Sequence, residues 1–324
     1  MNNKRAFLKP WGKITITLVG LTGIILGLSI PGYLENLKQA RNRQKKLGSE
    51  VLDTACGPIE YATVGEGEPV LFVHGVVGGY DQGIITSQVF LGEKFRIIAP
   101  SRFGYQHTLL PVDASPAAQA DAHACLLDAL QISKVSVVGI SAGVPSTLQF
   151  ALRHPERVSR LVLIVPLAYT PQPAMDSQSI AFPFILSSIL KLDYPIWVAM
   201  KLNPQLVLST MGVPKQIQGQ LTKEKQVETM NMLLPFNTRI PGTMNDGKIA
   251  NNMEPYPIRQ ISVPTLVISA KDDLWKTYPA AQYTASNIPE AKFIGFNTGG
   301  HMLNGQEEKV RQEITQFLRK DMSR

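Results

Sequence analysis

Short apolar runs alternate with helical patterns along most of the chain. Runs rich in Val, Ile and Leu, bounded by Gly, Pro or Asp, are typical of strands buried on both faces of a sheet. Together these patterns predict an α/β fold with a mostly parallel sheet flanked by helices. The expected strands are Ile59–Val64, Pro69–Val73, Phe95–Ala99, Val135–Val138, Val158–Val165, Thr265–Ser269 and Phe293–Phe296, and the expected helices are Ala117–Leu130, Ala142–Arg153 and Glu307–Arg319.

Residues 166–257 break this alternation. The stretch is rich in Pro and Met and carries clusters of Leu and Ile, so it favours helices over strands. Ligands of open α/β sheets bind at the carboxyl edge of the strands. We therefore expect this insertion to form a helical lid over that edge.

The N-terminal segment has a pattern of its own. Residues 14–30 are a run of 17 without charge, and a helix of that length rises about 25 Å, close to the thickness of a bilayer's hydrocarbon core. We expect residues 1–50 to be a transmembrane anchor with a basic linker and residues 51–324 to be the globular domain. A cleaved signal peptide and a buried core helix are the alternatives, although no small-x-small cleavage site stands near Ser29 and no polar face marks a core helix. Cations flank the run on both sides, so the membrane orientation stays open.

Charge and cysteine content narrow the range of possible functions. The net charge of +7 lies within residues 1–50, which hold nine Lys and Arg and two acids, while the rest of the chain holds 23 of each sign. Nucleic-acid binding needs excess cations on the folded body, so it is not expected. The basic N-terminal segment suits an anionic lipid surface instead. Cys56 and Cys125 lack metal-ligand spacing, and Cys125 is expected to be a small buried apolar residue of a helix.

Candidate chemistry begins at the sequence Gly-Ile-Ser-Ala-Gly, residues 139–143, between a strand and a helix. A serine on such a turn projects its hydroxyl above the sheet, and the flanking glycines relieve crowding. Ser141 is the expected nucleophile, with a chance Gly/Ser turn as the alternative. The amides of Ala142 and of Val76, in the loop after the second strand, are the expected oxyanion donors. His74 in that loop is expected to be structural.

Two further groups would complete a catalytic triad. His301 stands in a glycine-rich loop after the last strand and is the expected general base, with a solvent-facing histidine as the alternative. Asp272 and Asp273 both follow the strand that precedes it, and only one of two neighbours can face the histidine. No metal is expected, because the chain has neither a His-x-x-x-His nor a Cys-x-x-Cys pair. No cofactor is expected either, since Gly65-Glu66-Gly67 is too short and wrongly placed for a dinucleotide loop.

These residues resemble the α/β-hydrolase fold family from about Ile59 to the C-terminus, apart from the insertion. The chain order Ser, Asp, His is that of the family, in which the acid stands three residues after the small residue that ends its strand. Ala270 holds that place, so the resemblance implies Asp273 as the acid. The family usually has Gly at that place, and it usually has Asp-x-Arg-Gly where residues 101–104 read Ser-Arg-Phe-Gly, so Arg102 has no expected role. The motifs that carry the resemblance are His74-Gly75, Gly-x-Ser-x-Gly, Arg153–Val158, Val263-Pro264-Thr265 and Gly299-Gly300-His301.

The resemblance implies acyl transfer to water by Ser141, His301 and Asp273, acting on a small or lipophilic ester or a related acyl compound. Residues 74–83 and 100–105 also resemble a bacterial subgroup whose members are often tethered to membranes. A C–C or enol-lactone hydrolase with the same triad is one alternative, and a catalytically inactive, membrane-tethered binding protein on this fold is another.

Overall fold

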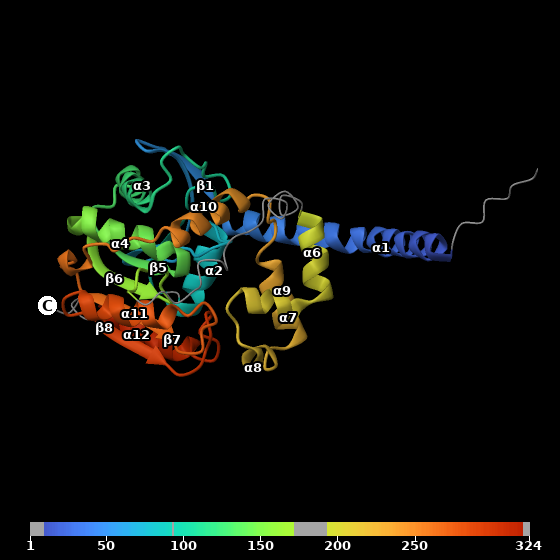
Figure 1. Ribbon diagram of the computed structural model, residues 1–324. Coiled ribbons are helices and arrows are strands. Elements are labelled where there is room, and N and C mark those ends of the chain that lie inside the picture. The colour runs from blue at the N-terminus through green and yellow to red at the C-terminus, as the bar shows by residue number, and fades with distance from the viewer. Residues whose placement is uncertain (1–9, 93, 172–192, 320–324) are drawn as a thin grey trace, which may run out of the picture.

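The computed structural model describes residues 10–92, 94–171 and 193–319. Within them, eight strands form one sheet in the order β1-β2-β4-β3-β5-β6-β7-β8 (Figure 1). The pairs β1–β2 and β2–β4 are antiparallel and the other five pairs are parallel. The expected α/β class with a mostly parallel sheet is therefore confirmed. The strands are β1 Glu50–Thr54, β2 Gly57–Val64, β3 Pro69–Val73, β4 Arg96–Pro100, β5 Val135–Ile140, β6 Val158–Ile164, β7 Thr265–Ala270 and β8 Lys292–Phe296.

Helices cover both faces of the sheet. On one face pack α3 (Pro116–Ala129), α4 (Val144–Arg153) and α11 (Thr277–Asn287). On the other pack α2 (Tyr80–Phe90) and α12 (Glu307–Arg319). Successive residues of a strand point to opposite faces, so each central strand feeds both cores and its sequence is apolar throughout.

Two of these helices, α2 and α11, have no clear signal in the sequence. The helix α2 buries Tyr80, Asp81, Ile84 and Phe90, so polar and apolar side chains alike face inward. A helix reveals itself in sequence by an apolar stripe opposite a polar face. Since α2 lacks that contrast, its pattern does not predict a helix.

The insertion between β6 and β7 is helical in its described part. Residues 172–192 of the expected lid lie outside the described residues. The remainder leads from the loop after β6 through five helices to the start of β7. These helices are α6 (Asp193–Leu202), α7 (Pro204–Thr210), α8 (Lys215–Gln218), α9 (Lys223–Asn231) and α10 (Ile240–Asn251).

The N-terminal helix α1 (Pro10–Leu47) contains the apolar run 14–30 and continues well beyond it (Figure 1). The side chains of residues 10–26 lie outside the described residues. Across the part of the chain that the structure describes, no helix is both long enough and apolar enough to cross a membrane. The expected transmembrane anchor is therefore not supported.

The polar second half of α1 is bound to the body of the molecule. Ala40 is fully buried against the insertion. The indole Nε1 of Trp197 donates to the Asn36 side-chain oxygen at 3.1 Å, and the Tyr80 hydroxyl donates to the Gln44 carbonyl at 3.0 Å. This half of the helix therefore touches both the insertion and the sheet domain.

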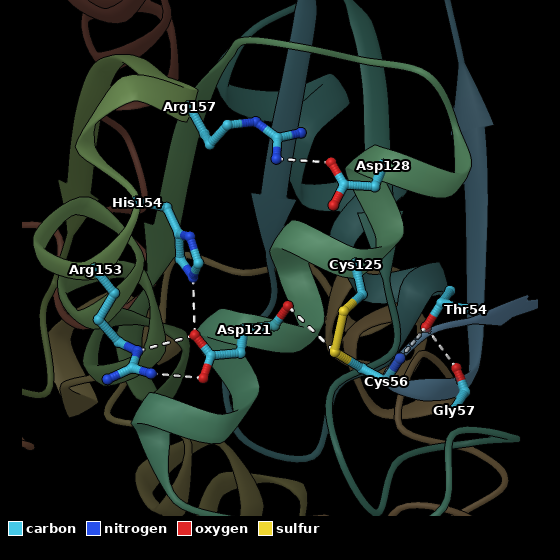
Figure 2. The surroundings of a disulfide bond; sticks show 9 residues. All are labelled: Thr54, Cys56, Gly57, Asp121, Cys125, Asp128, Arg153, His154 and Arg157. Atoms are coloured by element: carbon cyan, nitrogen blue, oxygen red, sulfur yellow. Dashed lines mark hydrogen bonds and ion pairs between the residues drawn. A yellow bond between two sulfur atoms is a disulfide. The ribbon is translucent and has the colours of Figure 1, made fainter.

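A disulfide bond joins Cys56 to Cys125, with Cα atoms 5.9 Å apart (Figure 2). Cys56 lies in the turn between β1 and β2, and Cys125 is in α3. The expectation that Cys125 is a buried apolar residue was wrong. The reason is the β1–β2 hairpin, whose turn meets α3 at this cysteine, a contact that the local helical pattern does not reveal.

The helix α3 is also tied to the segment that ends α4. The Asp121 carboxylate accepts from Arg153 at 2.7 Å and from His154 at 2.8 Å, and Asp128 pairs with Arg157 at 2.7 Å (Figure 2). The helix is thus held on one side by the hairpin and on the other by residues that lead into β6.

Candidate active site

The candidate nucleophile stands at the turn between β5 and α4. Ser141 has a φ of 52°, a left-handed backbone conformation that is costly for a residue with a Cβ atom. Such a turn lifts the serine hydroxyl above the end of its strand. The next helical turn, Ser141–Gly143, begins at the serine and leads into α4.

Close packing requires both glycines of this turn. A Cβ atom on Gly143 would lie 2.5 Å from the carbonyl oxygen of Val73 and 2.6 Å from that of His74. A Cβ atom on Gly139 would overlap the Thr147 side chain. The Gly-x-Ser-x-Gly pattern thus reflects the fit of the turn between β3 and α4.

The structure brings Ser141, His301 and Asp273 together in one hydrogen-bonded chain. Nε2 of His301 lies 2.8 Å from the Ser141 Oγ, and Nδ1 lies 2.9 Å from Oδ2 of Asp273. A carboxylate only accepts hydrogen bonds, so Nδ1 carries the proton and Nε2 accepts from the serine hydroxyl. All three residues are buried. This is the geometry needed to take a proton from the serine.

Asp273 is held in its ionised form. Burial by itself raises the pKa of its carboxyl, but His301 and three hydrogen bonds outweigh burial, and the pKa lies below its ordinary value of 3.8. Besides His301, the hydroxyl of Thr277 donates to Oδ2 and the backbone amide of Trp275 donates to Oδ1 at 2.8 Å. An ionised carboxylate at this place fixes the tautomer of the imidazole.

Asp272, the other candidate for the acid, points elsewhere. Its carboxylate accepts from the backbone amides of Gly300, at 2.8 Å, and Gly299, at 3.2 Å. It therefore binds the loop that carries His301 rather than the imidazole itself. The two neighbouring aspartates thus act differently: Asp273 binds the ring of His301, and Asp272 binds the backbone of the two glycines that precede it.

Two contacts at His301 had no signal in the sequence. The ring of Trp275 stacks on the imidazole with centroids 5.6 Å apart. The insertion reaches the same histidine through Gly212, whose carbonyl accepts from the His301 amide at 3.1 Å. Gly212 has no room for a side chain, because a Cβ atom there would lie 2.5 Å from both His301 and Trp275. The insertion is therefore in direct contact with the candidate site.

The loop after β3 lies against the serine. A Cβ atom on Gly75 would be 3.2 Å from the Ser141 Cβ. The backbone of this loop therefore passes beside the serine, and Val76 is its next residue. His74 is buried and binds its own loop, as expected. Its Nε2 accepts from the Arg102 amide at 3.0 Å, so its proton is on Nδ1, which donates to the Gly75 carbonyl at 2.7 Å.

Two buried histidines, His74 and His123, should make the protein sensitive to mild acid. Burial, followed by nearby cations, lowers the pKa of His74 well below 6.5 and that of His123 to about 3. Both stay neutral in the folded protein, while the unfolded chain binds protons below 6.5. Their stabilising contribution is complete above that pH and falls as the pH drops toward the folded pKa values.

We expect the free energy of unfolding to fall by about 1.4 kcal/mol per pH unit for each of these histidines between about pH 6 and pH 4. Urea unfolding at a series of pH values measures this slope. The variant His123→Gln should remove one histidine's share. The depressed carboxyl pKa values of Asp81 and Asp273 act only below 3.8. An identical slope in wild type and variant would contradict the prediction.

Over the ranges that the structure describes, no cluster of three or more His, Cys, Asp or Glu side chains could hold a metal ion.

Comparison with known proteins agrees with this geometry. Residues 68–308 match the model of the alpha/beta hydrolase fold family. The chain belongs to that family. "Uncharacterized hydrolase YcgS" of Bacillus subtilis is 41% identical over 260 residues, which are 76% of this chain and 89% of the relative.

A more distant relative and a solved structure extend the likeness. The "2-hydroxymuconate semialdehyde hydrolase" of Pseudomonas putida is 27% identical over 261 residues, covering 78% of this chain and 88% of that protein. The structure of an alpha/beta hydrolase fold protein from Nakamurella multipartita superposes with a TM-score of 0.67 at 26% identity, covering 84% of this chain and 99% of that one. The chain is therefore a hydrolase of this fold, and the bond it cleaves is a separate question.

Proposed function

We propose that this protein is a serine hydrolase that cleaves a carboxylic ester or a related acyl bond. Ser141 attacks the acyl carbon, His301 takes the serine proton and returns it to the leaving group, and Asp273 holds the imidazole. The amides of Val76 and Ala142 bind the oxyanion, each contributing on the order of 3 kcal/mol to the transition state. Water then releases the acyl group by the same steps in reverse order. The observation that carries the proposal is the hydrogen bond of 2.8 Å between His301 Nε2 and Ser141 Oγ.

The helical insertion forms the lid of this site. The carbonyl of Gly212 binds the backbone of the candidate base, and Gly212 packs against the ring of Trp275. A lid in this place excludes water from the oxyanion, which strengthens the hydrogen bonds that stabilise it.

The charges near the oxyanion loop favour a neutral acyl substrate. A carboxylate-bearing substrate would need a cation free to bind it. The two arginines that contact this loop, Arg102 and Arg239, are each paired with a buried aspartate, Asp246 and Asp81 respectively. Their charge is already matched, so an uncharged ester fits better than an anion.

A C–C hydrolase is the second candidate, favoured by the likeness to the Pseudomonas putida enzyme. It would use the same triad to cleave a carbon–carbon bond beside a carbonyl group. The 2-hydroxymuconate semialdehyde named for that relative carries a carboxylate, so the matched charges of the two arginines count against it here. Comparing rates on a neutral p-nitrophenyl ester and on that semialdehyde distinguishes the two candidates.

Labelling with a fluorophosphonate probe tests the nucleophile. We expect wild type to be labelled with one probe per chain and the Ser141→Ala variant not to be labelled, because the probe bonds only to an activated serine. Wild type that has not met the probe should hydrolyse p-nitrophenyl esters graded by chain length, and labelling should abolish that activity. Labelling that persists in the variant, or a folded wild type that neither reacts with the probe nor hydrolyses any ester, would contradict the proposal.

A further inference from the structure

Two buried ion pairs outside the triad connect the insertion to the sheet domain. Arg239, directly before α10, pairs with Asp81 of α2 through bonds of 2.6 and 3.1 Å. Asp246, within α10, pairs with Arg102 after β4 through two bonds of 2.7 Å. All four side chains are buried. The segment around α10 thus offers one cation and one anion, and the domain meets each with the opposite charge.

Both arginines also bind the backbone of the oxyanion loop. Nη1 of Arg239 donates to the Gly78 carbonyl at 2.7 Å. Arg102, for which the sequence suggested no role, donates through Nε to the His74 carbonyl at 2.9 Å and through Nη2 to the Gly75 carbonyl at 3.0 Å. These bonded carbonyls stand on both sides of Val76, the expected oxyanion donor.

The loop needs such support because its backbone is strained. Val77 has a φ of 56°, in the left-handed region that a β-branched residue avoids. A residue persists there only when its surroundings over-determine the conformation. The guanidinium of Arg239 is fixed by Asp81 and also binds the carbonyl of Gly78, the residue after Val77.

The N-terminal helix joins the same junction. The side-chain amide of Gln44 in α1 donates to Oδ2 of Asp81 at 3.0 Å, the oxygen that also accepts from Arg239. Asp81 is thus held by α1 and by the insertion at once. Burial by itself raises the pKa of this carboxyl, but Arg239 and the hydrogen bonds outweigh burial and lower it, so Asp81 stays charged and keeps the arginine in place.

We propose that Arg239 is a positioning residue for the oxyanion hole, acting through the Val77–Gly78 segment and oriented by Asp81. A buried ion pair adds little net stability compared with apolar residues of the same size, but it specifies one geometry. Here the specified geometry is that of the loop whose Val76 amide is to meet the developing oxyanion. This inference rests on the proposed acyl chemistry, since only a reaction with an oxyanion needs that amide.

The variant Arg239→Lys tests the proposal. A lysine keeps the positive charge facing Asp81, but its single ammonium lacks the planar fork that reaches the carboxylate and the Gly78 carbonyl together. We expect kcat on a p-nitrophenyl ester to fall about 10- to 100-fold with KM within about twofold, because the transition state loses an aligned donor while ground-state binding is kept. The matched control is Asp193→Asn, a buried insertion carboxylate bound to the Asn237 amide, which should leave kcat unchanged.

A thionoester of the same acid separates positioning from stability. Sulfur accepts hydrogen bonds more weakly than oxygen, so wild type should hydrolyse the ester much faster than the thionoester. A displaced Val76 amide slows the ester more than the thionoester, so the ratio of their kcat values should fall about tenfold in Arg239→Lys. Rates are given per site counted with the fluorophosphonate probe, so unfolded protein does not enter the ratio.

The outcomes are distinct from those that test the serine. If wild type shows turnover and a thionoester effect but Arg239→Lys keeps the wild-type ratio, the positioning role is wrong while the serine hydrolase stands. If wild type gives no labelling and no turnover, the proposed function itself fails. Should Arg239→Lys not fold, Asp81→Asn releases the same arginine with a change of one atom, and a wild-type ratio in that variant would equally overturn the inference.

Discussion

Replacing Asp273 by asparagine should lower kcat about 10⁴-fold while the protein stays folded. Asparagine would present an N–H or a neutral oxygen to Nδ1 of His301. Either change weakens the bond to Nδ1 that orients the ring. In wild type that orientation leaves Nε2 free to accept from Ser141 Oγ, which lies 2.8 Å away. KM should change little, because the carboxylate acts on the base and not on the bound substrate.

The neighbouring residue provides a control of the same chemistry. In Asp272→Asn the amide oxygen can still accept from the Gly300 amide, now bonded at 2.8 Å, while the bond from Gly299 is weakened. We expect a loss of about 1.5–3 kcal/mol of stability, the usual cost of one hydrogen bond to a charged group. The value of kcat should stay within about tenfold of wild type, because the imidazole keeps its own carboxylate.

Steady-state kinetics on an ester, with the folded fraction of each protein measured by circular dichroism, compare the two variants. Equal losses of kcat in Asp272→Asn and Asp273→Asn would contradict the assignment of the acid. A larger loss in Asp272→Asn would reverse it.

The meeting of the three candidate residues could be predicted from sequence because each of them follows a recognisable strand. Ser141 lies between an apolar run and a helix, where only small neighbours fit the turn, and His301 and Asp273 follow two later apolar runs. Parallel strands bring their carboxyl ends to one edge, so residues distant in sequence meet there. The choice between Asp272 and Asp273 came only from the family resemblance, since spacing alone does not give the direction of a side chain.

The buried ion pairs could not be predicted in the same way. Arg239 and Asp81 are separated by 158 residues, and Arg102 and Asp246 by 144. Each looks like an ordinary surface charge within its own segment, because charged residues are seldom buried unless paired. What buries them is the path of the insertion across the loop after β3, which no periodicity records. The departure from the family pattern at residues 101–104 gave a signal at Arg102, but without its partner the role stayed hidden.

The contacts of the N-terminal helix could not be predicted for a related reason. Length and hydropathy alone predict a span of the bilayer, yet the same helix continues into residues that bind the body. Asn36 meets Trp197 of the insertion, and Gln44 meets Asp81 and Tyr80 of the sheet domain. A polar pattern on the second half of a helix gives no indication of which surface it packs against.

Removing the disulfide should lower the free energy of unfolding by about 4 kcal/mol. The bond between Cys56 and Cys125 closes a loop of 69 residues, and opening it gives the unfolded chain more conformations. Urea unfolding of the Cys56→Ser/Cys125→Ser variant beside wild type measures the loss. The dependence on urea should also steepen, because a chain without the cross-link exposes more surface when it unfolds.

Reductant supplies the matched control for that comparison. Wild type unfolded in its presence should behave as the double variant does, and the variant should not respond to it. The kcat of the variant at 25 °C should match wild type, because the bond joins the β1–β2 turn to α3 while the triad follows β5, β7 and β8. Two reactive thiols in the native protein would contradict the presence of the disulfide. A double variant as stable as wild type would contradict its stabilising role. If the double variant loses stability but keeps its activity, the disulfide acts by restricting the unfolded chain. The geometry of the site then depends on the contacts made by the insertion instead.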